Sequence, residues 1–379
     1  MIYLDNAATT NYKPQSVIDA VNDCIVNYSF NPNRSGNKQA IILQQKIFDA
    51  RRKISLLANN DSANNVVFTS GCTEALNLAI LGTAKRGHVI ISTREHNSVL
   101  RPVMQLQKKG YVEVTVAEPD ENGEITADVI ARHIRQDTYL MCISHASNVN
   151  GDSQKLYELG ILARQNNLLF LVDCAQSMGY FPIDMNKCNV DMAAIAGHKG
   201  LHGIQGAGAL VFNKRANIRP IRFGGTGTES ELVYQPETVP DGLESGTLPC
   251  PAIIGMSAGV DFWLANWQHN RDVILDTQSL ILQGLKQIKN VNIYSRLNNS
   301  GIVAFNVGNI DSNEVADELS QKYDIAVRGG LQCAPLMHKY LGTSRQGVVR
   351  ASVSCVTTKA DCYALLNAVE AISKKSLAY

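Results

Sequence analysis

Two charged residues at the ends of apolar runs could take part in covalent chemistry. Lys199 follows the run 192–196 and precedes a glycine-rich stretch, and Asp173 closes the run 168–172. Lysine is rarely buried unless it is paired or used covalently, and an aldehyde cofactor needs one such amine. A carboxylate at a strand end could keep a pyridine nitrogen protonated, so that the ring accepts electrons. From the residues alone, Lys199 could also be a surface lysine and Asp173 a cap of the next helix.

A glycine turn and a cysteine loop add two groups that could bind or react. The segment 68–74 places small residues, Gly71 among them, between a predicted strand and a predicted helix, where backbone N–H groups could approach a phosphate. Such turns are also common without a ligand. Cys333 lies in the loop 328–335, after two glycines and before Pro335, which suits the first turn of a helix. Because helix N-termini lower thiol pKa values, Cys333 is the best candidate for a reactive thiolate, although a buried structural cysteine would have the same spacing.

The elements that must position these groups follow an alternating pattern. Short apolar runs alternate with amphipathic stretches through the first two-thirds of the chain, which predicts an α/β fold with a mostly parallel sheet between helices. Such sheets bind ligands at the carboxyl ends of their strands, where all four segments fall. The predicted strands are 66–70, 88–92, 112–117, 139–145, 168–173, 192–196 and 208–212, and the helices between them are 73–85, 98–109, 127–135 and 156–165.

The length of 379 residues exceeds one ordinary domain, so two lobes are expected. A large domain over 15–250 would hold the sheet, and 251–379 together with 1–14 would form a smaller α/β domain. The segment 224–251, rich in Gly, Thr, Glu and Pro, has no clear period, and a loop of this length is usually functional. In the smaller domain the predicted helices are 252–289, 312–322 and 359–373, and the predicted strands are 302–307, 325–328 and 348–352.

Composition and charge argue against several classes of protein. The formal net charge of +1 gives no basic face for nucleic acid or an anionic membrane. No apolar run is long enough for a transmembrane helix, and the first residues lack the pattern of a signal peptide, so a cytoplasmic protein is expected. The nine cysteines are odd in number and form no CxxC pair, which argues against a disulfide framework and against a metal site.

Along nearly its whole length the chain resembles the cysteine desulfurase (NifS-like) branch of the class-V, fold-type I enzymes that use pyridoxal 5'-phosphate (PLP). The resemblance implies a large domain with a mostly parallel sheet between helices and a smaller C-terminal α/β domain. It is carried by YLDNAATT from Tyr3, FTSGCTEALNLAI from Phe68, EHNS from Glu95, HASN from His145, VDCAQSMG from Val172, AGHKGLHGIQGAGAL from Ala196, GGTG from Gly224, ESGTLPCPAI from Glu244, RGGLQCAPLMHKYLGT from Arg328 and VVRASVSC from Val348.

The resemblance also implies a role for each matching residue around the cofactor. Lys199 would form the Schiff base with PLP, Asp173 would pair with the ring nitrogen, Gln176 would bind the ring hydroxyl, and His96 would stack on the ring. The residues implied around the phosphate are Gly71, Cys72, Thr73, His198 and, from the other chain of a homodimer, Thr226 of the partner subunit.

The implied reaction converts L-cysteine to L-alanine and leaves the sulfur as a persulfide on Cys333, from which a sulfur-acceptor protein would take it. Asn148 and Arg350 would bind the substrate carboxylate, and Lys199 would remove the α-proton. Because only five positions separate Arg328 from Cys333, we expect a short tether and a partly sheltered persulfide. A selenocysteine lyase or another β-lyase of the same fold is the alternative, and a catalytically idle PLP-binding scaffold is a further one.

Ala196, Gln332 and His338 lie within the matching motifs but have no assigned role around the cofactor. Relatives usually carry Ser where this chain has Ala196, so one hydrogen bond to the phosphate would be missing or supplied from elsewhere. Gln332, which precedes the thiol, varies within the family and could bear on substrate choice. His338, on the helix expected after Pro335, is interpreted as a packing residue.

Overall fold

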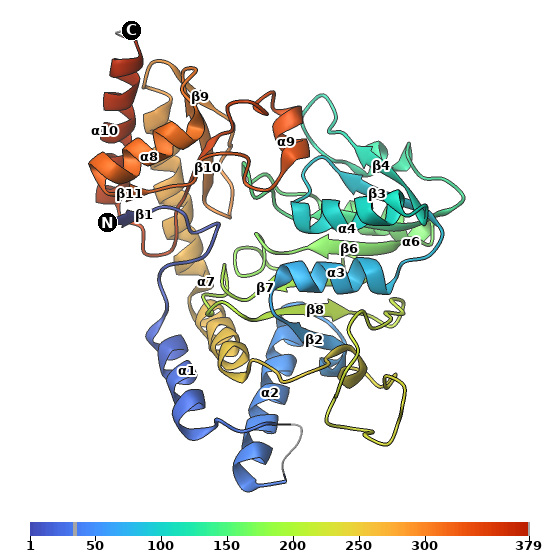
Figure 1. Ribbon diagram of the computed structural model, residues 1–379. Coiled ribbons are helices and arrows are strands. Elements are labelled where there is room, and N and C mark those ends of the chain that lie inside the picture. The colour runs from blue at the N-terminus through green and yellow to red at the C-terminus, as the bar shows by residue number, and fades with distance from the viewer. Residues whose placement is uncertain (33–35, 378–379) are drawn as a thin grey trace.

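The computed structural model describes residues 1–32 and 36–377, and its largest element is a seven-stranded sheet (Figure 1). The strand order is β2-β8-β7-β6-β5-β3-β4. Strands β4, β3, β5, β6 and β7 are parallel to one another, whereas β8 runs antiparallel to both β7 and β2. The predicted mostly parallel sheet is therefore confirmed. Its strands are β2 (Val66–Thr69), β3 (Gly87–Ser92), β4 (Val112–Ala117), β5 (Thr138–Ser144), β6 (Leu169–Asp173), β7 (Met192–Ala196) and β8 (Gly208–Phe212).

Helices cover both faces of this sheet because its central strands are apolar on both sides. In β5, Met141 and Ile143 belong to one hydrophobic cluster, and Leu140 and Cys142 belong to the cluster on the other face. Alternating side chains of a strand point to opposite faces, so both faces need a covering layer. The helices of this part are α1 (Gln15–Asn27), α2 (Lys38–Leu57), α3 (Cys72–Gly82), α4 (Asn97–Lys108), α5 (Ala127–Ala131) and α6 (Leu156–Gln165), with short 3₁₀ turns η1 (Ala63–Asn65) and η2 (Asp241–Leu243).

A second, smaller lobe contains an antiparallel sheet of order β12-β10-β9. The first residues of the chain join it, because β1 pairs in parallel with β11. Figure 1 shows this lobe at the upper left, with both termini on it. Its strands and helices are β1 (Ile2–Tyr3), β9 (Val291–Ile293), β10 (Ile302–Val307), α8 (Ser312–Tyr323), β11 (Ile325–Ala326), α9 (Pro335–Tyr340), β12 (Val349–Ser352) and α10 (Lys359–Ser376).

One long helix, α7 (Cys250–Leu285), belongs to both lobes. Met256 and Val260, in its first half, lie in the core beside the large sheet. Ile281 and Leu285, near its end, lie in the core of the smaller lobe. A domain division at residue 250 stays a prediction, because α7 is one continuous helix that packs in the cores of both lobes. No helix among the described residues is long and apolar enough to cross a membrane.

Candidate active site

A cavity of about 290 Å³ lies at the carboxyl ends of β2, β5, β6 and β7. This is the edge of a parallel sheet where ligands are expected. Nine of the residues assigned to a site from the sequence line it, although they come from five separate segments of the chain. These nine are Gly71, Cys72, Thr73, His96, Asn148, Asp173, Gln176, His198 and Lys199.

Lys199 lies in the turn that follows β7 and is held there by the chain's first residues. The Thr10 hydroxyl donates to the Lys199 carbonyl at 3.2 Å. Gly200 lets the turn pack closely, since a Cβ there would lie 2.3 Å from the carbonyl oxygen of Met178. Burial lowers the pKa of the Lys199 amine, and the nearby charge of Asp173 opposes this shift. The lowered pKa raises the fraction of neutral amine, which is the form that attacks an aldehyde.

Asp173 and Gln176 present acceptor oxygens to the same cavity. Asp173 is the last residue of β6, and its Oδ1 accepts from the backbone N–H of Ala175 at 2.8 Å and from the Cys72 thiol at 3.5 Å. Gln176 donates from Nε2 to the Ala7 carbonyl at 2.8 Å, while its buried Oε1 has no partner among the described residues. A buried amide oxygen without a donor is costly, so this atom fits a ligand that carries a hydroxyl group.

His96 is fixed at one ring nitrogen by the start of α4. Its Nδ1 accepts from the Ser98 backbone N–H at 3.0 Å and lies 2.9 Å from the Ser98 hydroxyl, which in turn lies 2.8 Å from Thr73 Oγ1. Burial lowers the pKa of His96 to about 4, so the ring is neutral near pH 7. Because Nδ1 accepts a hydrogen bond, the ring hydrogen resides on Nε2. A neutral, oriented ring of this kind can stack on an aromatic ligand.

The end of the cavity beside α3 has the features of an anion site. Gly71 is the N-cap of this helix, and Cys72 and Thr73 form its first turn, where free N–H groups favour a phosphate. His198 is held by Thr9, whose Oγ1 lies 3.0 Å from its Nδ1, and burial lowers the His198 pKa to about 4. Ala196 lines the same cavity and offers no hydroxyl. The residues present therefore fit PLP at its ring and at its phosphate.

Arg350 is buried close to the cavity but is not one of its lining residues, and it already has partners. Its Nη2 donates to Asp5 Oδ1 at 2.8 Å and its Nη1 to the Asn148 carbonyl at 2.8 Å, while its buried Nε has no partner among the described residues. The guanidinium is close enough for its charge to help lower the Lys199 pKa. A substrate carboxylate would therefore meet a guanidinium that Asp5 holds in place. Asp5 lies in the YLDNAATT motif, but the sequence alone predicted no role for it.

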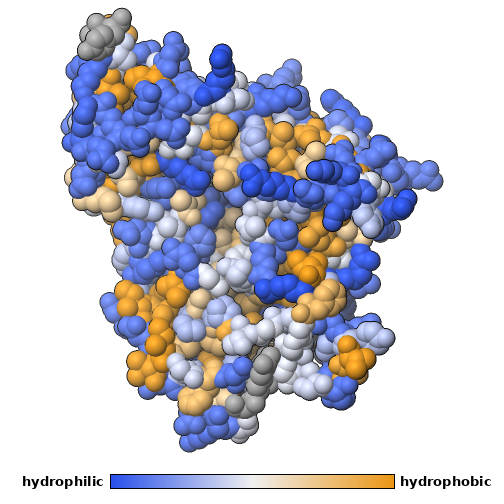
Figure 2. Space-filling view, in the orientation of Figure 1, coloured by the Kyte–Doolittle hydropathy of each residue, from blue (hydrophilic) through white to orange (hydrophobic). Residues whose placement is uncertain are grey.

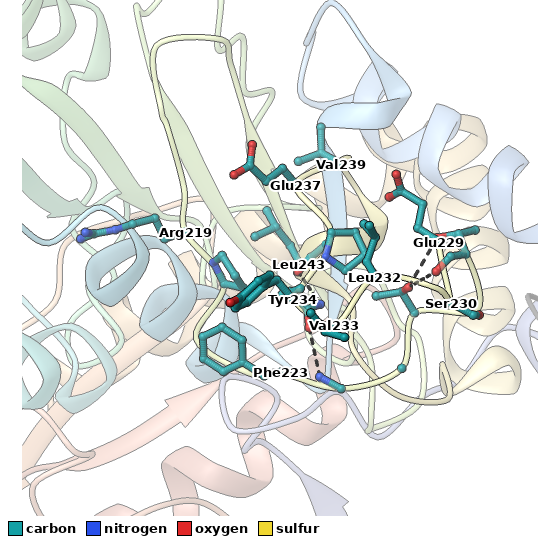
Figure 3. A pocket seen from close by; sticks show the side chains of 18 of the residues that line it. Arg219, Phe223, Glu229, Ser230, Leu232, Val233, Tyr234, Glu237, Val239 and Leu243 are labelled. Atoms are coloured by element: carbon teal, nitrogen blue, oxygen red, sulfur yellow. Dashed lines mark hydrogen bonds between the residues drawn. The ribbon is translucent and has the colours of Figure 1, made fainter.

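Cys333 and Thr226 lie outside this cavity. Of the nine cysteines, all within the described residues, Cys333 alone is exposed, so the expectation of a sheltered thiol is wrong for this single chain. Its loop nevertheless touches the site, because the Cys333 carbonyl accepts from the backbone N–H of Asn97 at 2.8 Å. Thr226 lines a different cavity of about 910 Å³, shown in Figure 3, which is formed by residues 217–243.

Glu95 is a buried carboxyl beside the site that sequence reasoning missed. It accepts from Ser144 through the backbone N–H at 3.0 Å and the hydroxyl at 2.8 Å, and from the Ser92 hydroxyl at 2.6 Å. Burial raises the pKa of Glu95 to about 7. Ser92 ends β3 and Ser144 ends β5, so the Glu95 carboxyl connects the ends of these two strands through hydrogen bonds. Glu95 directly precedes His96 in the sequence. The only sequence signal was its place in the EHNS motif.

Comparisons with known proteins agree on one family. The model of the aminotransferase class-V family matches residues 2–365. A probable cysteine desulfurase from Methanothermobacter thermautotrophicus is 32% identical over 98% of this chain and 94% of its own length. The cysteine desulfurase IscS of Vibrio campbellii is 33% identical over 88% of this chain and 80% of its own.

Solved structures show the same similarity in three dimensions. The apo structure of a cysteine desulfurase from Thermococcus onnurineus superposes with a TM-score of 0.91 at 28% identity, covering 99% of this chain and 95% of its own. The cysteine desulfurase CsdA of Escherichia coli, in an S-sulfonic acid form, gives a TM-score of 0.88 at 26% identity, covering 98% and 94%.

Proposed function

The chain belongs to the class-V aminotransferase family, and from this membership and its site we propose that it is a PLP-dependent cysteine desulfurase. It would convert L-cysteine to L-alanine and transfer the sulfur to Cys333. The proposal also rests on the position of Cys333. Its loop adjoins the cavity that holds Lys199 and Asp173, and among the nine cysteines, all of which the structure describes, only Cys333 is exposed.

The residues that would hold PLP are those whose free groups face the cavity. Asp173 would pair with the ring nitrogen, Gln176 Oε1 would accept from the ring hydroxyl, and the N-terminus of α3 with His198 would bind the phosphate. When bound, PLP would supply an electron sink for negative charge at the substrate α-carbon.

The protein's own groups would orient the substrate and move its protons. Arg350, positioned by Asp5, and the amide of Asn148 would bind the substrate carboxylate, since a guanidinium can form two parallel hydrogen bonds with it. The Lys199 amine, made less basic by burial, would take the α-proton on Nζ. The neutral ring of His96 would stack over the reacting centre with its hydrogen on Nε2.

Cys333 would complete the reaction as the nucleophile. Its thiolate attacks the sulfur of the bound cysteine, the carbon–sulfur bond breaks, and the electron pair of that bond stays on carbon, which is then protonated. The products are alanine and a Cys333 persulfide, so no external oxidant or reductant is required. The exposed position of Cys333 would let a sulfur-acceptor protein reach the persulfide.

The test is to incubate the purified protein with L-cysteine and to measure alanine, sulfide and protein-bound persulfide. In a single turnover we expect one alanine per persulfide, with the persulfide located on Cys333. Cys333→Ser should abolish persulfide formation and leave the cofactor absorbance nearly unchanged, because Cys333 does not line the cavity. Undiminished release of sulfide from cysteine by this variant would identify a β-lyase instead, and turnover of selenocysteine alone would identify a selenocysteine lyase.

A homodimer belongs to the same proposal. Thr226 is 5% exposed in a segment whose neighbouring apolar side chains face solvent: Phe223 is 74%, Val233 91% and Tyr234 84% exposed. Figure 3 shows these side chains around the cavity of this segment, and Figure 2 shows apolar surface at the lower right, where the segment lies. A second copy of the chain packed here would bury this surface, and Thr226 of the partner subunit would then reach the phosphate.

A further inference from the structure

The loop that carries Cys333 has a backbone conformation that its residue types disfavour. Gln332 and Cys333 have φ angles of 41° and 57°. This left-handed region is uncommon for residues that carry a Cβ, and neither residue is one of the types that tolerate it best. Two such residues in succession persist only where the surrounding structure fixes them. The loop therefore requires contacts that hold it in this shape.

Gln332 supplies these contacts from inside the protein. The residue is 2% exposed, and its Nε2 donates to the Val348 carbonyl at 2.9 Å. Its Oε1 accepts from His338 Nε2 at 3.0 Å, and its own carbonyl accepts from Asn148 Nδ2 at 2.6 Å. Gln332 is thus anchored through both its side chain and its backbone, while the next residue, Cys333, is exposed.

His338 is fully buried and is fixed at both ring nitrogens. The Gln332 amide oxygen can only accept, so His338 Nε2 carries the hydrogen, and Nδ1 accepts from the Thr343 hydroxyl at 2.8 Å. Burial lowers the pKa of His338 to about 4, which keeps the ring in the neutral state that this arrangement needs. The ring therefore connects α9 to the Cys333 loop through hydrogen bonds of defined direction.

The same loop is tied to two walls of the Lys199 cavity. Asn148 lines the cavity and donates to the Gln332 carbonyl. The Cys333 carbonyl accepts from the backbone of Asn97, which follows His96 in the sequence. Any movement of the loop would change the distance between the thiol and a substrate in the cavity. A displacement of about 1 Å at a reacting group can lower a rate about a hundredfold.

We propose that Gln332 and His338 are positioning residues that fix the Cys333 loop in the conformation from which the thiol attacks the substrate sulfur. The inference rests on the proposed function, because it takes Cys333 as the sulfur acceptor. Neither side chain touches the substrate, and both act through the backbone of Cys333. This inference goes beyond the interpretation of His338 as a packing residue, because the ring is hydrogen-bonded to the residue that directly precedes Cys333.

The test begins with His338→Phe, which keeps a ring in place and removes both hydrogen bonds. In a single turnover with L-cysteine, persulfide formation on Cys333 should slow by about tenfold to a hundredfold. The KM for cysteine and the PLP absorbance should change by less than about twofold, because no residue of the loop lines the cavity. Hydrogen exchange of the peptide 328–340, measured without substrate, should become faster, and this readout does not depend on activity.

Two further variants separate positioning from general stability. His338→Gln keeps an N–H that can reach Gln332 Oε1, so it should restore most of the rate. His88→Phe is the matched control, because His88 is also fully buried and lies 2.8 Å from a threonine hydroxyl at each ring nitrogen, Thr138 and Thr115, but belongs to β3. It should leave the exchange of the loop and the persulfide rate unchanged.

The outcomes distinguish this inference from the proposed function. If the unaltered protein forms no persulfide on Cys333, the proposed function fails and the inference falls with it. If the unaltered protein shows a normal burst and His338→Phe matches it, or if His88→Phe slows the burst as strongly, the inference alone is overturned.

Discussion

Lys199 is the residue on which the chemistry of the site depends most. It would be the point of covalent attachment of PLP, so borohydride reduction should fix the cofactor to Lys199, and peptide mass mapping should find it there. In Lys199→Ala the label should be lost. Lys13→Met is the matched control, because burial lowers the pKa of Lys13 to about 8 although the residue does not line the cavity. A label on one defined lysine in Lys199→Ala would contradict the assignment.

At the scale of elements, α7 supports the turn that carries Lys199. A Cβ at Gly259, within this helix, would lie 1.7 Å from the Leu201 carbonyl oxygen, two residues beyond Lys199. Gly259→Ala should therefore push the helix and the turn apart. Overpacking of this kind costs about 1–3 kcal/mol. We expect a lower free energy of unfolding and weaker PLP binding, measured by denaturant titration and by cofactor absorbance.

Gly284→Ala in the same helix provides the comparison. There the three atoms nearest to a Cβ all belong to the side chain of Leu366, the closest at 2.3 Å, and that side chain can rotate away. Since alanine favours a helix over glycine by about 1 kcal/mol, this variant should be nearly neutral and should bind PLP normally. Equal losses in both variants would show that α7 does not act on the Lys199 turn.

At the scale of the whole molecule, the prediction concerns a site shared between two chains. Thr226→Ala should weaken PLP binding about tenfold to a hundredfold, the range for losing one hydrogen bond to a charged group. Lys199→Ala chains should bind no PLP covalently. When the two variants are co-expressed, a hybrid dimer has one site with both an intact Lys199 and an intact Thr226 of the partner subunit. That site should regain normal affinity and turnover.

The hybrid experiment is read by PLP titration, alanine production and analytical ultracentrifugation. Mixtures that perform only as the sum of the two separate variants would argue against a shared site. A fully active monomer would rule out the homodimer. Glu244 attaches the segment 224–251, which contains Thr226, to α2 and β2. The Glu244 side chain is buried, pairs with Arg51 of α2 and accepts a hydrogen bond from the backbone of β2.

Much of the fold could be predicted from the sequence because its signals are local. The bounds of β4, β7, β8, β10 and α6 agree with the predicted ranges, since unbroken apolar runs and a clear helical period mark them. Helices α1 and α2 were not predicted, and exposed apolar residues such as Ile25, Ile41 and Phe48 blur their periodicity. Strands β1 and β9, of two and three residues, are too short to show a period.

The residue types of the site were likewise determined by the sequence, whereas their partners were decided by the tertiary structure. Lys199 and Asp173 lie at the ends of apolar runs that predict neighbouring strands, so their placement near one sheet edge follows from the alternation of strands and helices. Cys333 follows a predicted strand of the smaller lobe, and only the tertiary structure brings its loop beside Asn97. The ion pair of Arg350 with Asp5 joins residues 345 positions apart. The bond from His338 to Gln332 depends on how α9 packs against its own loop. The first contact arises from the closure of distant segments and the second from the turn between Gln332 and α9. No local pattern of residue types encodes the distance between the two partners in either case.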